Sequence, residues 1–131
     1  MIRGFEVTLY SRNLQTTQRF YEGLGFVETF RYPGAGEPHH VELTQNSFKL
    51  GIVDIGKASA DHGFTASLGG HTAELVFWND DTDGLFATLI GAGASVISEP
   101  HDWLGRLRVA WIGDPDGNPI QLVQEQTSRG R

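Results

Sequence analysis

The sequence predicts an α+β fold made of two βαβββ modules, because one order of strand, polar turn and helix occurs twice. Around Glu6, an alternating apolar and polar segment leads into a polar turn and an amphipathic helix that ends in glycines. The same order recurs around Glu74. An offset of 68 positions aligns Glu6 with Glu74, Tyr10 with Trp78, Gly23 with Gly91 and Gly25 with Gly93. Each module should bury one sheet face under its helix and leave the other face open.

The first module covers about residues 1–55. Residues 5–11 alternate apolar and polar side chains, which is typical of a half-buried strand. Asn13 is a suitable N-cap for a helix that runs to about Gly23, where glycines end it. Three further strands are predicted at 27–31, 41–43 and 48–53, and the last two form a hairpin.

The second module covers about residues 70–125, after a linker at 56–69 with weak periodicity and several glycines. Linkers of this length in a small protein are often mobile or functional. Asp80 and Asp81 supply the cap and first-turn acids of the second helix. Strands are predicted at 72–78, 95–97, 107–112 and 120–123, with a turn at 114–118.

Composition narrows the function classes. The chain has 131 residues, 39% of them hydrophobic, which is enough for a real core. It has no cysteine, which excludes disulfides, thiolate metal sites and a cysteine nucleophile. A net charge of −6 without a basic run argues against a nucleic-acid partner. No apolar segment is long enough for a membrane span, and the first residues lead directly into a strand, so we expect a cytoplasmic protein without a signal peptide.

These motifs resemble the vicinal oxygen chelate superfamily, which includes glyoxalases, extradiol dioxygenases, fosfomycin-modifying enzymes and bleomycin-resistance proteins. The residues that carry the resemblance are 14–26 in the first module and 80–83, 91–93 and 114–120 in the second. The resemblance covers nearly the whole chain. It implies curved sheets around a cup, and a homodimer. Its motifs mark turns and helix packing, so they do not specify a reaction.

Enzymes of this superfamily hold a divalent metal in the cup. The resemblance places the ligands at Glu6, Glu74 and Gln121, with Lys49 or Gly51 at the fourth position. Positions that often carry His have Glu here, and one that often carries Glu has Gln. Two carboxylates and an amide suit Mg²⁺ or Mn²⁺, whereas Zn²⁺, Fe²⁺ and Ni²⁺ favour imidazole. The alternatives are therefore an oxygen-rich metal site and a cup without a metal cofactor.

We favour the metal-free alternative. Glu6 and Glu74 would then create a negative potential, and tryptophans would supply flat walls for a planar or cationic group. This combination predicts a small-molecule binding protein that sequesters an aromatic or cationic ligand such as an antibiotic, similar to the drug-sequestering members of the superfamily. The predicted ligand-binding residues are Glu6, Tyr10, His40, Glu74, Trp78, Trp103, Trp111 and Gln121.

The alternative function is a glyoxalase-like lyase or isomerase. Glu6 or Glu74 would act as the general base, with or without a weakly bound divalent metal. The sequence favours a non-enzymatic role without excluding this one.

The sequence also gives several local expectations and leaves one facing open. His39 and His40 are expected on opposite faces of a strand, with His40 and Glu42 sharing a face. Arg108 is expected to form a structural ion pair. The facing of 107–112 is ambiguous, because either Val109 and Trp111 or their neighbours could line the cup. His62 and His101 are most simply solvated.

Overall fold

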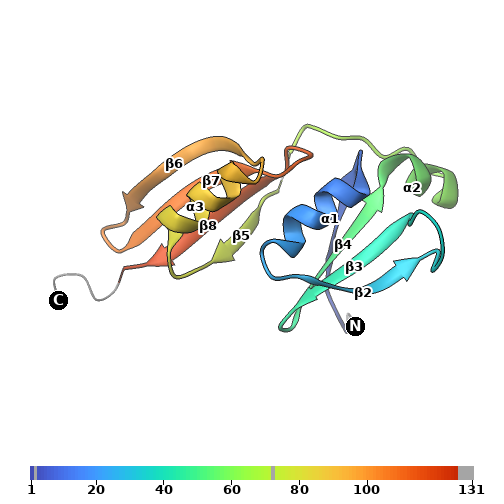
Figure 1. Ribbon diagram of the computed structural model, residues 1–131, viewed down its shortest axis with the longest axis horizontal. Coiled ribbons are helices and arrows are strands. Elements are labelled where there is room, and N and C mark those ends of the chain that lie inside the picture. Colours follow the sequence, from blue (N-terminus) through green and yellow to red (C-terminus); the bar gives the residue numbers. More distant parts are fainter. Residues whose placement is uncertain (2, 72, 127–131) are drawn as a thin grey trace. The chain divides into compact units, whose positions relative to one another are not determined.

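The computed structural model describes residues 1, 3–71 and 73–126. The chain divides into two compact units, Met1–Leu68 and Gly69–Arg131, and each is described here by itself. Each unit contains one four-stranded sheet with a helix packed on one face (Figure 1). The predicted α+β fold of two βαβββ modules is therefore confirmed.

The first unit has a sheet with strand order β1-β4-β3-β2. The strand β1 pairs in parallel with β4, and the other neighbours are antiparallel. The elements in chain order are β1 (Val7–Ser11), α1 (Leu14–Glu22), β2 (Val27–Tyr32), β3 (His40–Gln45), β4 (Phe48–Asp54) and α2 (Ile55–His62).

The helix α1 covers one face of this sheet because alternate strand residues are apolar. Leu9, Val41 and Ile52 lie in register across three strands and are buried. Behind them, Ser11 Oγ and Thr17 Oγ1 lie 2.9 Å apart in a buried hydrogen bond between β1 and α1. The residues between these positions on each strand therefore lie on the face opposite α1.

Asn13 caps α1 as predicted, since its Oδ1 accepts a hydrogen bond from the Thr16 backbone N–H at 3.2 Å. Gly25 follows the helix at φ +102°, a conformation that favours glycine. The strands β3 and β4 extend the predicted hairpin, and Asn46 occupies its turn at φ 54°.

The segment predicted to be an irregular linker contains the helix α2. Asp54 caps this helix, since its Oδ1 accepts from the Lys57 backbone N–H at 2.9 Å. Gly63 ends it in the left-handed conformation at φ 72°. The sequence signal was weak because the helix is short and only Ala58 within it is buried.

The second unit has the equivalent sheet, with strand order β5-β8-β7-β6. The strand β5 pairs in parallel with β8, and the other pairs are antiparallel. The elements are β5 (Leu75–Trp78), α3 (Thr82–Gly91), β6 (Ser95–Trp103), β7 (Leu107–Gly113) and β8 (Pro119–Glu125).

The strand β6 is much longer than the predicted 95–97 and includes Pro100. Two register shifts interrupt its pairing with β7, between Val96 and Ser98 and between Ser98 and His101. Irregular pairing of this kind accommodates a proline, which has no backbone N–H. The longer strand carries Trp103 onto the sheet.

Two predicted features of the second unit are confirmed. In the turn after β7, Asp114 Oδ1 accepts the backbone N–H of Asp116 at 2.9 Å and of Asn118 at 2.8 Å. Arg108 forms ion pairs with Asp83 of α3 at 3.0 Å and with Asp102 of β6 at 3.1 Å. These two ion pairs join α3 to the sheet, and the hydrogen bond to Asp83 raises the pKa of the Arg108 guanidinium.

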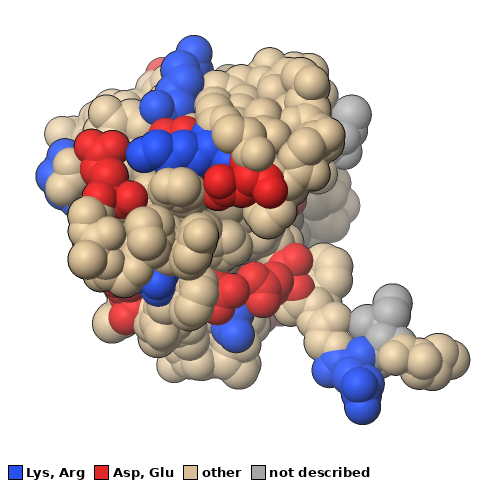
Figure 2. All heavy atoms as spheres, turned by 90° about the vertical axis from the view of Figure 1, so that its right-hand side faces the viewer, with Lys and Arg blue, Asp and Glu red and all other residues tan. Residues whose placement is uncertain are grey.

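The described residues include no helix that is long and apolar enough to cross a membrane. On the face drawn in Figure 2, acidic and basic side chains are interspersed, without a continuous basic area.

Substituting Glu28 with Gln should change the pH dependence of stability. Glu28 accepts hydrogen bonds from Arg31 Nε at 2.9 Å and Nη2 at 3.0 Å, and these hold the pKa of the Glu28 carboxyl below its ordinary value. A carboxyl with a lowered pKa stabilises the fold above the unfolded value, about 4.3, and loses that contribution as pH falls through the folded pKa. Urea unfolding should show the wild type more stable than Glu28→Gln at neutral pH, with the difference shrinking in acid. A difference that stays constant with pH would contradict this assignment.

Candidate functional site

The strands of the second unit gather predicted site residues on the face opposite α3. Ala110 and Ile112 are buried and pair with Leu122 and Ile120, while Arg108 on the same side contacts α3. Val109 and Trp111 therefore lie on the opposite face, which answers the question that the sequence left open. Trp111 is paired with Gln121, and Gln121 with Val76, so three strands contribute to one row.

Glu74 is joined to this row by a hydrogen bond. The indole Nε1 of Trp111 donates to Glu74 Oε1 at 2.9 Å. Trp111 is half-buried because it packs on a cluster formed by Leu107, Val109 and Val123. Packing on this cluster restrains the Trp111 ring, and the indole N–H restrains one oxygen of Glu74, whose side chain is otherwise exposed.

Further rings lie on this face of the sheet, and one of them contacts Trp111. His101 stacks on it with a centroid separation of 6.2 Å and an interplanar angle of 22°. His101 Nδ1 lies 2.7 Å from the Glu99 carbonyl oxygen, which restrains the imidazole. Trp103 pairs with Leu107, and Trp78 with Val123, so both belong to the same face and are exposed. We call this set, Glu74, Trp78, His101, Trp103, Trp111 and Gln121, the tryptophan face.

His101 is exposed, as expected, but the sequence interpretation missed that it stacks on Trp111. The sequence could not predict this contact, because the register shifts of β6 break the alternation that would show which face each residue lies on. An imidazole stacked on an indole adds a second flat surface to the tryptophan face.

The first unit places Tyr10 and His40 on the face opposite α1, since both pair with Val53. Tyr10 also contacts Phe64, with ring centroids 6.4 Å apart. Glu6 is exposed and directly precedes β1. These three predicted residues belong to the first unit and the other five belong to the second. Their roles in ligand binding remain predictions.

A pocket of about 380 Å³ lies between the sheet of the first unit and α2. Its lining includes Tyr32, His40 and Val53 from the sheet together with Ala58, Asp61 and His62 from α2. His39 also lines it, although His39 and His40 were expected on opposite faces. That expectation was wrong because β3 begins only at His40, so strand alternation does not apply to His39.

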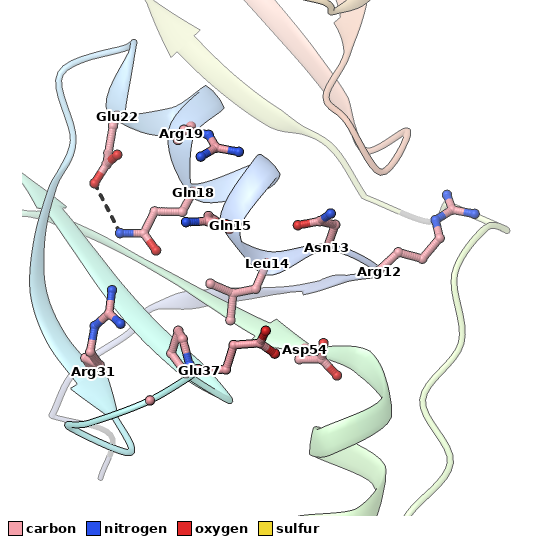
Figure 3. Close-up of a pocket in the computed structure, with 12 residues that line it drawn as sticks. Arg12, Asn13, Leu14, Gln15, Gln18, Arg19, Glu22, Arg31, Glu37 and Asp54 are labelled. Atoms are coloured by element: carbon pink, nitrogen blue, oxygen red, sulfur yellow. Dashed lines mark hydrogen bonds between the residues drawn. The ribbon is translucent and has the colours of Figure 1, made fainter.

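A second hollow of about 590 Å³ lies on the other side of this unit, along α1 and the 33–38 loop (Figure 3). In Figure 3, Arg31 and Glu37 lie across the hollow from the α1 residues Gln18 and Glu22. Its charges are partly paired, since Arg31 bonds Glu28, and Glu37 lies 3.3 Å from Lys57 Nζ. Its strongly polar lining differs from the tryptophan face and offers no flat apolar wall.

The metal ligands implied by the resemblance can be tested against the strand register. Thr8 pairs with Gly51 in the first unit as Val76 pairs with Gln121 in the second, so Gly51 is the equivalent of Gln121. Glycine supplies no side-chain ligand there. A Cβ at Gly51 would lie 2.7 Å from Thr8 Oγ1, so Thr8 already fills the space.

The donor set of each unit fits the implied metal poorly. In the second unit, the Trp111 indole occupies one oxygen of Glu74. Across the part of the chain that the structure describes, no group of three or more His, Cys, Asp or Glu side chains is arranged to hold a metal ion. The alternative set of Glu6, Glu74 and Gln121 draws on both units and stays a prediction.

Replacing Gly51 with Ala should destabilise the first unit, because the added methyl group meets Thr8. We expect a cost of about 1–2 kcal/mol in the free energy of unfolding, which is typical of overpacking. Adding Thr8→Ala should recover most of that loss, and thermal unfolding of the two single variants and the double variant measures the coupling. Purely additive effects would show that the two side chains do not compete for this space.

Comparison with known proteins supports the architecture. The model of the Glyoxalase/Bleomycin resistance protein/Dioxygenase superfamily matches residues 5–122. No curated protein gives a match. Among solved structures, a hypothetical protein from S. aureus is 19% identical with a TM-score of 0.79, and 95% of each chain is covered.

Two further structures have the same fold. A glyoxalase-related enzyme from Fulvimarina pelagi is 21% identical with a TM-score of 0.78, covering 95% of this chain and 89% of its own. A lactoylglutathione lyase from Agrobacterium tumefaciens is 21% identical with a TM-score of 0.63, covering 96% of both chains. Similarity at this identity shows the fold alone. Because the family model spans nearly all of both βαβββ units, this chain belongs to the Glyoxalase/Bleomycin resistance protein/Dioxygenase superfamily.

Proposed function

We propose that this protein is a metal-independent binding protein that sequesters a small planar aromatic cation on its tryptophan face. The observation that carries the proposal is the hydrogen bond from Trp111 to Glu74, with His101 stacked on the same ring. It places a negative charge at the edge of a flat aromatic surface.

This arrangement matches the two properties of such a ligand. The faces of Trp78, Trp103 and Trp111 attract a cation through their quadrupoles and offer area for stacking. The Trp111 indole donates to Glu74 Oε1, so the other carboxylate oxygen of Glu74 can pair with the positive charge of a ligand. Gln121, next to Trp111 in the register, supplies a polar contact.

Restraint of the central ring also supports a binding role. Trp111 packs on three buried apolar residues, Leu107, Val109 and Val123, and donates its N–H to Glu74. A ring that is already fixed loses little side-chain entropy when a ligand stacks on it. Glu6 and Tyr10 are the first-unit equivalents of Glu74 and Trp78 in the sequence repeat, and their roles in ligand binding stay predictions.

The charge of Glu74 should determine affinity for a cation. Glu74→Gln keeps a carbonyl oxygen that accepts from the Trp111 indole but removes the negative charge. Calorimetric titration with 1-methylquinolinium should show about fivefold weaker binding by this variant, the size expected for an exposed charge pair. Neutral quinoline at neutral pH should bind wild type and variant within about twofold.

Glu99→Gln is the matched control, since Glu99 contacts the tryptophan face through its backbone carbonyl. It should bind both probes as the wild type does. Equal loss of quinoline and 1-methylquinolinium binding in Glu74→Gln would point to a damaged surface and would contradict the charge role.

Binding should not depend on a metal. We expect the affinity for 1-methylquinolinium to be the same after dialysis against EDTA and after incubation with Mn²⁺ or Mg²⁺, because the donor sets within the units lack a third ligand. Elemental analysis of the same samples measures retained metal. About one metal per chain, together with binding that EDTA abolishes, would overturn the metal-independent proposal and favour the lyase or isomerase alternative.

A further inference from the structure

We propose that the hollow along α1 in the first unit is a binding site for a small zwitterion, an α-amino acid. All the residues that line it lie within 12–54 and therefore belong to the first unit. Its volume of about 590 Å³ is within the range of small-molecule sites and accommodates a free amino acid.

The observation that points to a ligand is the side-chain amide of Gln18. This residue is only 8% exposed, yet its Oε1 accepts no hydrogen bond from any described residue. The oxygen is not among the fully enclosed unpaired atoms of the described chain, so a ligand can reach it. Figure 3 shows it directed away from Glu22 and into the hollow. Gln18 therefore offers an open acceptor in the wall of the hollow.

The orientation of this amide follows from its neighbours. Gln18 Nε2 donates to Glu22 Oε2 at 3.1 Å and to Glu28 Oε1 at 2.7 Å. Of the two amide ends, only the NH₂ group can donate to two carboxylates. The flipped amide would place its oxygen against two negative charges, so the acceptor and not the donor faces the hollow.

Arg31 supplies an open donor next to this acceptor. Its Nε and Nη2 donate to Glu28 at 2.9 Å and 3.0 Å, and its Nη1 has no partner among the described residues. Gln18 Nε2 and Arg31 Nη2 bond the same atom, Glu28 Oε1. One carboxylate therefore holds the two side chains together. Groups that are fixed in this way lose little side-chain entropy when a ligand binds.

A zwitterion uses both open groups at once. Its ammonium can donate to Gln18 Oε1 and to the Glu22 oxygen that Gln18 does not engage, and its carboxylate can accept from Arg31 Nη1. A simple amine would leave the arginine donor unused, and a simple carboxylate would leave the amide acceptor unused. An α-amino acid carries both charges on one carbon, which agrees with a donor and an acceptor held by a single carboxylate.

The apolar part of the lining indicates the side chain of the ligand. Leu14 is 5% exposed and projects from the start of α1 toward the hollow in Figure 3. Pro38 lines the hollow from the preceding loop of β3. An aliphatic side chain can pack on these two residues while the charged groups reach Gln18 and Arg31. Leucine is therefore the appropriate probe.

The test compares leucine with 3-methylbutylamine, which lacks the carboxylate, and with 4-methylpentanoate, which lacks the ammonium. Calorimetric titration at neutral pH should show that leucine binds about fivefold more tightly than either, the gain expected from one further hydrogen bond. Arg31→Lys keeps a cation beside Glu28 but removes Nη1, so it should weaken leucine binding about fivefold and change amine binding by less than about twofold.

Two variants test the ammonium end. Gln18→Met should weaken the binding of leucine and leave that of 4-methylpentanoate unchanged. Glu22→Gln keeps an oxygen that accepts from Gln18 and removes the charge, so it should give the same pattern even if Gln18→Met disturbs folding. Arg12→Gln is the matched control, because the Arg12 side chain points away from the hollow in Figure 3, and it should bind leucine as the wild type does.

Several results would overturn this inference: no detectable binding of leucine, equal affinities for the three probes, or leucine binding that Arg31→Lys and Glu22→Gln both leave unchanged. Leucine has no aromatic ring and no net charge at neutral pH. The outcome is therefore distinguishable from that of the 1-methylquinolinium titrations.

Discussion

The hydrogen bond from Trp111 to Glu74 is the interaction on which the proposed site depends. It joins β7 to the residue directly before β5, two segments that are separated in the sheet by β8. The bond exists only because the β7–β8 register directs Trp111 away from α3, while Ile112 and Ala110 face the helix. A one-residue slip of this register would turn Trp111 toward α3 and would turn Arg108, Ala110 and Ile112 away from it. Fold and site are therefore coupled through strand register.

The two units use the same topology for different surfaces. Thr8 and Gly51 in the first unit stand where Val76 and Gln121 stand in the second, and the first unit adds α2 against its sheet. The result is a histidine-lined pocket in one unit and a broad tryptophan face in the other. Repeated modules can diverge in this way because the helix-covered face carries the packing and the other face is free to vary.

Much of the architecture could be predicted from the sequence. Asn13 and Asp81 cap the predicted helices, and the turn at Asp114 joins the predicted strands, because these are local signals. The facing of Trp111, the stacking of His101 and the closeness of His39 to Asp61 could not be predicted. Each depends on register, on a bulged strand or on a helix with only one buried residue, none of which periodicity reveals. The family relationship settled the fold and left the ligand open.

The measurement that tests the central claim most directly is an NMR titration of protein labelled with ¹⁵N-tryptophan, using 1-methylquinolinium. The three tryptophans, Trp78, Trp103 and Trp111, all lie on the tryptophan face, and Trp111→Phe assigns the signal of the ring bonded to Glu74. The account predicts a saturable shift of the Trp111 indole signal, accompanied by smaller shifts of the other two. An unchanged Trp111 signal in the presence of bound 1-methylquinolinium would contradict it, because the cation would then lie away from Glu74.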